Sequence, residues 1–219
     1  AFLLDEPQGT NLLPQSQTLN NPTFFTTTSA TTSLVSVLNP ANSLASFEYR
    51  LNNTTTDNQY IRIAGNATYA SGVTQSYSLF IKYGSFQFCK ISYLNFSTSN
   101  SVTVIYDLIN GIISNTIISG GGSVASSSKI QSLQNGWFRI SISAALSSSA
   151  GNAMNFQFNK VSSATPSLDS LGRETQTTST ADFCYLDKAQ LEVGGLTSYI
   201  PTAGAAVTRN KDDITRTPP

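Results

Sequence analysis

The chain of 219 residues contains no histidine, one tryptophan, one methionine and two cysteines. Histidine is the commonest general base and a frequent metal ligand, so its absence argues against an enzyme. Paired carboxylates could replace it, as they do in glycosidases. The two adjacent pairs, Asp5 with Glu6 and Asp212 with Asp213, however, lie in predicted terminal segments where no cleft is expected. We therefore expect a protein without catalytic activity.

Charge is also scarce. Only 11% of the residues are charged, and 12 basic residues balance 12 acidic ones. A chain with no excess of positive charge creates no broad field that would attract nucleic acid or an anionic membrane surface. It also lacks an apolar run of about 18 residues, the length that a membrane-spanning helix needs. Neither nucleic acid nor a membrane is therefore an expected partner.

The two cysteines, Cys89 and Cys184, fall in predicted strands that could meet across a sandwich of two sheets. Two thiols do not make a disulfide framework of the kind found in small secreted domains. We expect free buried thiols, with a single disulfide as the alternative.

Most of the polarity comes from Ser, Thr, Asn and Gln, whose short side chains suit strands and turns better than helices. Phe47, Tyr49 and Leu51 alternate with polar neighbours, which is typical of a half-buried strand, and Asn110-Gly111 is a strong hairpin signal. About ten such strands follow one another without a helical period. The sequence therefore predicts an all-β fold, an antiparallel two-sheet jelly-roll β-sandwich.

Several segments receive more specific predictions. Residues 23–28 and 33–38 are predicted to form a hairpin, and residues 162–181 one long loop. In residues 137–146 the even positions from Phe138 onward are predicted to face the core, which turns Trp137 and Arg139 outward. Met154, Phe156 and Phe158 repeat this pattern, and the residues between and after them form a polar row on the opposite face: Asn155, Gln157 and Asn159.

Residues 183–193 form the most regular predicted strand, with its odd positions on the apolar face. Asp187 is the one carboxylate among these odd positions. A carboxylate on a buried face must be hydrogen-bonded, paired with a cation or bound to a metal.

The length of the chain suits a single sandwich domain. We predict a lead-in strand segment at residues 1–14, the jelly-roll domain at 15–203 and a C-terminal linker or tail at 204–219. Because the sequence begins at Ala1, we expect a fragment or a processed product.

Five motifs resemble the concanavalin A-like, carbohydrate-binding-module-like jelly-roll domains of tailed-phage structural proteins. They are residues 3–13, 77–82 and 136–141, the Ala-Gln-Leu-Glu-Val-Gly motif at 189–194, and residues 197–209. The resemblance implies a bacteriophage virion surface protein, that is, a tail, fibre or capsid-decorating component. It also implies other virion proteins as partners, a homo-oligomer with a trimer favoured, and attachment to host-surface carbohydrate. A non-viral carbohydrate-binding module of a secreted enzyme or adhesin is the alternative.

Residues 11–14 and 185–187 are similar to family 4 and 9 carbohydrate-binding modules, which hold a structural calcium near an Asp of their last strand. Asp187 matches that Asp and is the candidate calcium ligand. The acidic positions expected after residue 14 are Gln17 and Leu19, so one carboxylate of the calcium shell is missing. Asp5 and Glu6 could replace it only if the lead-in strand folds back.

The candidate glycan-binding residues are those predicted to face outward. Aromatic rings bind the C–H faces of sugars, and planar amides reach their hydroxyl groups. The candidates are Trp137, Arg139, Asn155, Gln157, Asn159, Tyr60 and Arg62. Two alternatives remain open: a loop or a neighbouring subunit covers Trp137 while the amides form a solvated face, or the sandwich has a purely architectural role.

Overall fold

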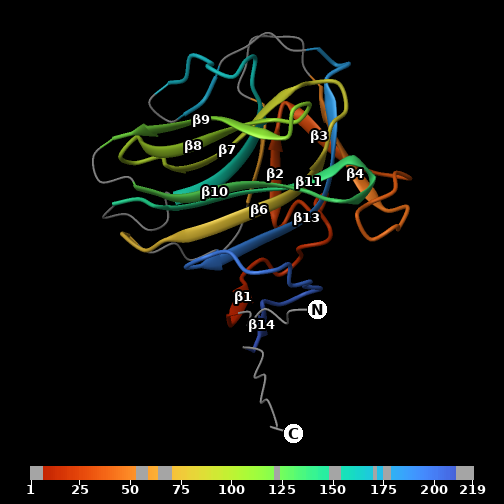
Figure 1. Ribbon diagram of the computed structural model, residues 1–219, viewed down its shortest axis with the longest axis horizontal. Coiled ribbons are helices and arrows are strands. Elements are labelled where there is room, and N and C mark those ends of the chain that lie inside the picture. Colours follow the sequence, from red (N-terminus) through yellow and green to blue (C-terminus); the bar gives the residue numbers. More distant parts are fainter. Residues whose placement is uncertain are drawn as a thin grey trace, which may run out of the picture.

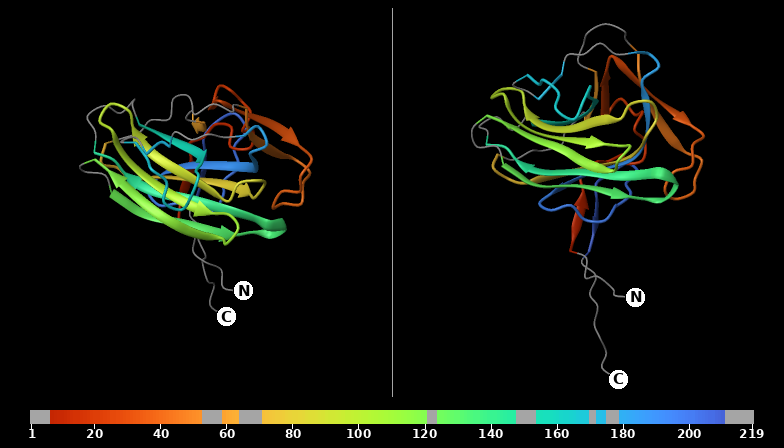
Figure 2. Two further views of the ribbon diagram at one scale, coloured as in Figure 1. Left: turned by 90° about the horizontal axis from the view of Figure 1, so that it is seen from above. Right: turned by 45° about the horizontal axis from the view of Figure 1, so that its top comes forward.

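The computed structural model describes residues 7–52, 59–63, 71–120, 124–147, 154–169, 172–174 and 179–210. Within these residues, two six-stranded antiparallel sheets and a two-stranded ribbon account for the strands (Figures 1 and 2). This confirms the predicted all-β, antiparallel jelly-roll sandwich. The same residues contain one short 3-10 turn, Gln134–Gly136, and no helix long and apolar enough to cross a membrane.

The two sheets are named here after a central strand. The β6 sheet has the order β10 (Val124–Ser132), β11 (Trp137–Ala145), β6 (Gln75–Lys82), β13 (Phe183–Val193), β4 (Ser46–Leu51), β3 (Ala30–Val35). The β7 sheet has the order β2 (Phe25–Thr28), β5 (Tyr60–Ile63), β12 (Met154–Lys160), β7 (Phe88–Asn95), β8 (Asn100–Asp107), β9 (Ile112–Ser119). The chain passes repeatedly from one sheet to the other, as a jelly roll requires.

The predicted hairpin between residues 23–28 and 33–38 is wrong. Strand β2 pairs with β5 in the β7 sheet, whereas β3 pairs with β4 in the β6 sheet. Between them Ser29 has a φ of 48°, in the left-handed region, and this backbone geometry accompanies the passage between sheets. The turn at Asn39 and Pro40 closes β3 onto β4 instead.

The core between the sheets follows the predicted alternation on most strands. Ile140 and Ile142 of β11 and Phe156 and Phe158 of β12 are all buried in it. The Phe156 ring stacks on Tyr93, with 4.3 Å between ring centroids. Cys89 and Cys184 also lie in this core as free thiols, which confirms the expectation of buried, unbridged cysteines.

Strand β13 departs from the predicted alternation. Its register shifts between Leu186 and Ala189, so a bulge occupies Asp187 and Lys188. Cys184 and Leu186 face the core before the bulge, and Ala189 and Leu191 face it afterwards. A bulge inserts a residue and reverses the parity of everything that follows. The prediction that all odd positions face the core is therefore wrong.

The described ends of the chain pair with each other. Strand β1 (Gly9–Asn11) runs antiparallel to β14 (Val207–Arg209), and Figure 1 shows this ribbon beneath the sandwich. Part of the segment predicted as a linker, residues 207–209, is thus a strand. The predicted domain boundaries themselves stay a prediction.

Candidate functional site

The β7 sheet has one face toward the core and one polar face directed away from it. Four strands contribute a row of polar residues in register across this polar face: Arg62, Gln157, Ser92 and Thr103. Asn159 and Lys90 pair beside this row. Gln157, Lys90, Ser92 and Thr103 are all 0% exposed, so the polar face is covered rather than solvated.

Part of the cover is the loop that follows β12, named here the covering loop (residues 161–169 and 172–174). Gly172, at a φ of +68°, lies so close to the sheet that a Cβ there would overlap Thr103 Oγ1 and come within 3.3 Å of Ser101 Oγ. Contacts within the loop hold it in shape. The Ser162 backbone N–H donates to Glu174 at 2.9 Å, and Arg173 forms an ion pair with Asp169 at 2.7 Å.

Several polar atoms on this face have no hydrogen-bond partner in the described part of the chain. They are both amide atoms of Gln157, Nε of Arg62 and Oδ1 of Asn155. A buried polar atom without a partner costs about 1–3 kcal/mol. Gln75 has the same unpaired amide, but it stands at the end of β6 on the core side. On the polar face three neighbouring described side chains share this deficit, with Gln157 directly opposite Arg62.

Lys90 was not among the residues predicted from the sequence. Its ammonium donates to Ser92 Oγ at 2.9 Å and Asn159 Oδ1 at 3.4 Å, both neutral acceptors. Burial lowers the pKa of Lys90 to about 7, against the opposing effect of Asp169 and Glu174. The one available signal is a lysine within residues 89–97, a stretch that has apolar residues on both faces.

The structure brings together five of the seven predicted glycan-binding residues. Arg62, Asn155, Gln157 and Asn159 share the polar face, and Tyr60 lies two positions before Arg62 on β5. The other two, Trp137 and Arg139, belong to β11 in the opposite sheet. The polar row was predictable because β12 alternates regularly, whereas assigning residues to sheets required the topology.

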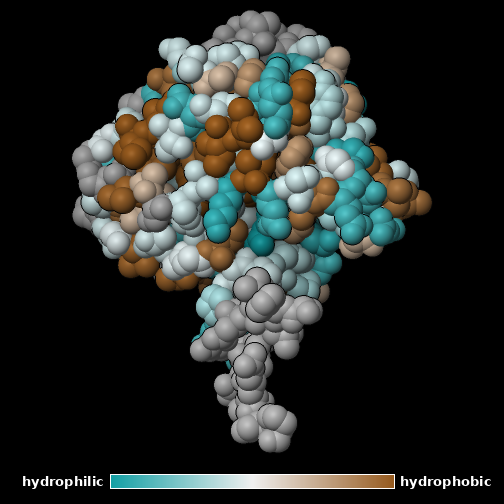
Figure 3. All heavy atoms as spheres, viewed as in Figure 1, coloured by the Kyte–Doolittle hydropathy of each residue, from teal (hydrophilic) through white to brown (hydrophobic). Residues whose placement is uncertain are grey.

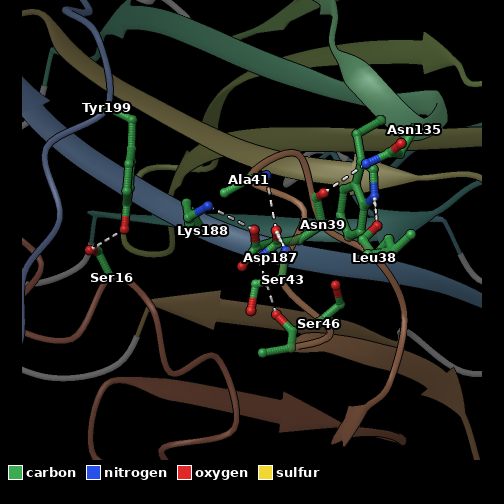
Figure 4. Close-up of polar contacts among 12 residues, drawn as sticks. Ser16, Leu38, Asn39, Ala41, Ser43, Ser46, Asn135, Asp187, Lys188 and Tyr199 are labelled. Atoms are coloured by element: carbon green, nitrogen blue, oxygen red, sulfur yellow. Dashed lines mark hydrogen bonds and ion pairs between the residues drawn. The ribbon is translucent and has the colours of Figure 1, made fainter.

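Trp137 is 0% exposed, and its indole Nε1 donates to the Leu38 carbonyl at 2.7 Å. Figure 4 shows the loop that supplies this carbonyl. Asn39 Oδ1 accepts from the backbone N–H groups of Ala41 and Ser43, and Asn135 Nδ2 donates to the Asn39 carbonyl. Of the two interpretations of Trp137, the one in which a loop covers the ring is observed. The candidate sugar-binding role of Trp137 is corrected accordingly, because its ring is enclosed.

Arg139 lies on the outer face of the β6 sheet. Its Nε and Nη2 both donate to Ser78 Oγ, at 3.1 and 3.0 Å, and its guanidinium lies 5.7 Å from the Phe80 ring centroid. It also lines an open groove of about 580 Å³ together with Lys129, Gln131 and residues 195–198. This groove is separate from the polar face.

Asp187 is paired with a cation from its own strand. Its Oδ2 lies 3.1 Å from Lys188 Nζ at the β13 bulge, as Figure 4 shows. Burial raises the pKa of Asp187, and Lys188 opposes that shift. Among the described residues, no group of three or more acidic, cysteine or histidine side chains could hold a metal. The described partner of Asp187 is thus an ammonium, and the calcium site stays a prediction. Asp5 and Glu6 lie outside the described residues.

The motifs at residues 189–194 and 197–209 have a structural role. Glu192 accepts from the Thr197 backbone N–H at 2.8 Å, and Gln190 Oε1 accepts from the Ile200 backbone N–H at 2.7 Å. These bonds fix a strap (residues 195–202) on the outer face of β13. The hydrogen bonds of these motifs therefore hold the strap against the sheet.

The described residues thus define a jelly-roll protein with a buried, incompletely satisfied polar face on one sheet. No protein-family model matches the chain, and no curated protein does. Among solved structures, it is similar to the N-terminal CBM22-1–GH10 modules of the endo-1,4-beta-D-xylanase 10B of Clostridium thermocellum, solved with xylohexaose. The TM-score is 0.45 at 12% identity, over 84% of this chain and 29% of the other. The chain thus spans less than a third of that structure, and a likeness this distant carries no argument about function.

Proposed function

We propose that this protein is a non-catalytic module that binds glycans through the polar face of the β7 sheet. The observation that carries the proposal is the cluster of unpaired, buried polar atoms on Gln157, Arg62 and Asn155. A folded protein rarely leaves three neighbouring side chains in this state unless another molecule completes them. A ligand with several hydroxyl groups would do so, since each hydroxyl both donates and accepts.

The residue types on this face suit a sugar. Gln157 and Asn155 offer planar amides, and Arg62 offers a guanidinium that only donates. Ser92 and Thr103 already hydrogen-bond each other at 2.8 Å, which fixes their hydroxyls at the floor of the site. Access requires the covering loop to move, because it contacts this floor through Gly172.

The setting that we propose is the surface of a bacteriophage particle, as a tail, fibre or capsid-decorating component, where glycan binding would attach the particle to its host. This rests on the sequence motifs, whose resemblance to phage structural domains spans nearly the whole chain. A carbohydrate-binding module of a non-viral secreted enzyme or adhesin is the second candidate. Labelling of intact particles by an antibody against this domain would distinguish the two.

Assembly with other copies or other virion proteins belongs to the same proposal. Strand β9 forms an edge of the β7 sheet and has neither charge nor proline, the two devices that commonly protect such edges. Ile112 and Ile118 on it are each more than half exposed, and Figure 3 shows apolar side chains on the side where β9 and β10 lie. Light scattering on the purified chain tests this. A mass of two or three chains supports assembly, whereas a monomer leaves glycan binding untouched.

Glycan binding is tested with an array probed by the parent protein, Gln157→Ala and the matched control Gln131→Ala. Gln131 is an exposed amide on β10 of the other sheet. We expect the parent protein and Gln131→Ala to bind the same glycans. Gln157→Ala should bind them at least about tenfold more weakly, because it loses one to two buried hydrogen bonds to the ligand. Because the Gln157 amide makes no hydrogen bond in the free protein, the melting temperature of Gln157→Ala should differ little from that of the parent protein. Equal binding by Gln157→Ala would rule out the polar face.

A further inference from the structure

Two cations stand on either side of the amide row on the polar face. Arg62 on β5 and Lys90 on β7 both belong to strands that neighbour β12, and they are offset by two residues along it, so their backbones are about 12 Å apart. Gln157 and Asn159 of β12 lie between them, paired with Arg62 and Lys90 respectively. A sugar ring over the amides would therefore have a positive charge at each side.

None of the described groups around Lys90 forms an ion pair with it. Within the described part of its own sheet, its ammonium hydrogen-bonds to the neutral Ser92 and Asn159. From the covering loop, Asp169, Glu174 and Arg173 act on it electrostatically. Asp169 is already paired with Arg173, and Glu174 accepts two hydrogen bonds from Ser162.

No ion pair of Lys90 is found among the described residues, which makes it a buried ammonium that lacks an anion. The described charges that act on Lys90 are the carboxylates of Asp169 and Glu174 and the guanidinium of Arg173. A buried charge is tolerated best when an opposite charge and hydrogen bonds accompany it.

We propose that the glycan bound by the polar face carries a carboxylate, as uronic and sialic acids do, and that this carboxylate pairs with Lys90. The inference rests on the glycan-binding function proposed above and specifies its ligand class. The ligand carboxylate supplies the missing negative charge beside Lys90. The sugar hydroxyls meet the unpaired atoms of Gln157 and Asn155, and the Nε of Arg62 donates to a ring or hydroxyl oxygen.

The experiment uses probes that differ only in the carboxylate. Calorimetry compares oligogalacturonate with its methyl ester and sialyllactose with its methyl ester, for the parent protein, Lys90→Met and the control Lys129→Met. Lys129 is an exposed lysine of the β6 sheet. We expect at least one acidic probe to bind tenfold or more tightly than its neutral counterpart. This preference should disappear in Lys90→Met and persist in Lys129→Met.

A second readout follows Lys90 directly. The lysine side-chain resonances, assigned by comparison with Lys90→Met, give its pKa with and without the acidic probe. A carboxylate beside the ammonium should raise this pKa, and the neutral counterparts should not. Affinity for the acidic probe should also fall as the pH rises above 7, where free Lys90 loses its proton.

The outcomes separate the two levels of the proposal. Neutral probes that bind as tightly as acidic ones overturn the acidic-sugar inference and leave the glycan-binding function standing. An acid preference that survives in Lys90→Met places the carboxylate elsewhere and also overturns the inference. If none of the four probes binds and the array with the parent protein is empty, both the inference and the proposed function are wrong.

Discussion

Lys90 shows what the polar face costs the folded protein. Its ammonium is 0% exposed, and its two hydrogen-bond partners, Ser92 and Asn159, are neutral. Burial lowers its pKa from 10.5 to about 7, so the folded state disfavours the charge that the unfolded chain carries freely. Residues whose pKa is shifted this strongly are often found at functional sites.

The sign of the resulting pH dependence follows from proton linkage. Between pH 7 and 10.5 the unfolded chain holds a proton on Lys90 that the folded protein has lost. The free energy of unfolding therefore rises with pH in this window. Below pH 7 both states are protonated, and the destabilisation by Lys90 is constant and at its largest.

We predict that Lys90→Met is more stable than the parent protein at pH 7 and that this advantage shrinks as the pH rises. One pKa unit corresponds to about 1.4 kcal/mol, so the difference in unfolding free energy should fall by about 2 kcal/mol between pH 7 and 8.5. Urea unfolding of both proteins at the two pH values measures it. The cysteines begin to ionise in the unfolded chain at about pH 8.5. Both proteins contain the same cysteines, so this contribution to the unfolding free energy cancels in the difference. A difference that is constant with pH would mean that Lys90 stays protonated.

At the scale of single elements, the covering loop depends on one glycine. Gly172 has a φ of +68°, a conformation that costs other residues energy, and its Cα faces Thr103 and Ser101. Both features favour glycine. They also place the loop backbone against the floor of the proposed site.

We predict that Gly172→Ala destabilises the protein by about 1–3 kcal/mol, because the added Cβ overlaps Thr103 Oγ1 and the backbone is strained. The loop should lift from the sheet and become cleaved more rapidly in limited proteolysis. Gly195→Ala is the matched control, since nothing lies within 4 Å of a Cβ there. Identical melting temperatures for the two variants would show that the loop does not rest on the sheet.

The strap on β13 shows what the sequence motifs encode. Asn11, from the motif near the start of the chain, donates to the Ile200 carbonyl at 2.7 Å and accepts from the Leu191 backbone N–H at 3.2 Å. Segments nearly 190 positions apart are thus joined by one side chain. The contacts of this motif residue are therefore explained by the scaffold.

Sequence reasoning succeeded where an element is regular and decided by its own residues. Strand β12 alternates without interruption, so its core face and its polar row, Asn155, Gln157 and Asn159, were both predictable. The core face of strand β13 was not predictable. Its bulge at Asp187 and Lys188 leaves the alternation in the sequence intact but reverses which positions face the core.

The remaining errors concern residues whose surroundings come from elsewhere in the chain. Trp137 is covered by the loop that contains Leu38, about a hundred positions away. Lys90 lies on the polar face of β7, and the covering loop that lies over part of this face follows β12. The neighbours of a side chain in the sequence do not reveal such cover. For this reason the sequence indicates neither that the Trp137 ring is enclosed nor that Lys90 is a buried residue of the polar face.

At the scale of the whole molecule, the two sheets are held together by a shared core. Cys89 comes from β7 and Cys184 from β13, so each sheet contributes one thiol to this core. Burial raises the pKa of both thiols. Charge repulsion from Asp107 adds to the shift of Cys89, and repulsion from ionised Cys89 and from Glu48 adds to that of Cys184. Only the thiolate reacts with disulfide reagents. Neither cysteine should therefore react while the sheets are stacked.

We predict that both thiols are labelled at the same rate and only when the sheets separate. At pH 8 an aromatic disulfide reagent should label the native protein at least about a thousand times more slowly than the protein in urea, because opening the core costs several kcal/mol. Cys89→Ala and Cys184→Ala report one thiol each, and Ser127→Cys, exposed on β10, should react at once as a positive control. Equal rates for Cys89 and Cys184 would establish that the sandwich opens as a unit. A much faster rate for one would instead show that its strand detaches alone, so that the two sheets do not act as one cooperative structure.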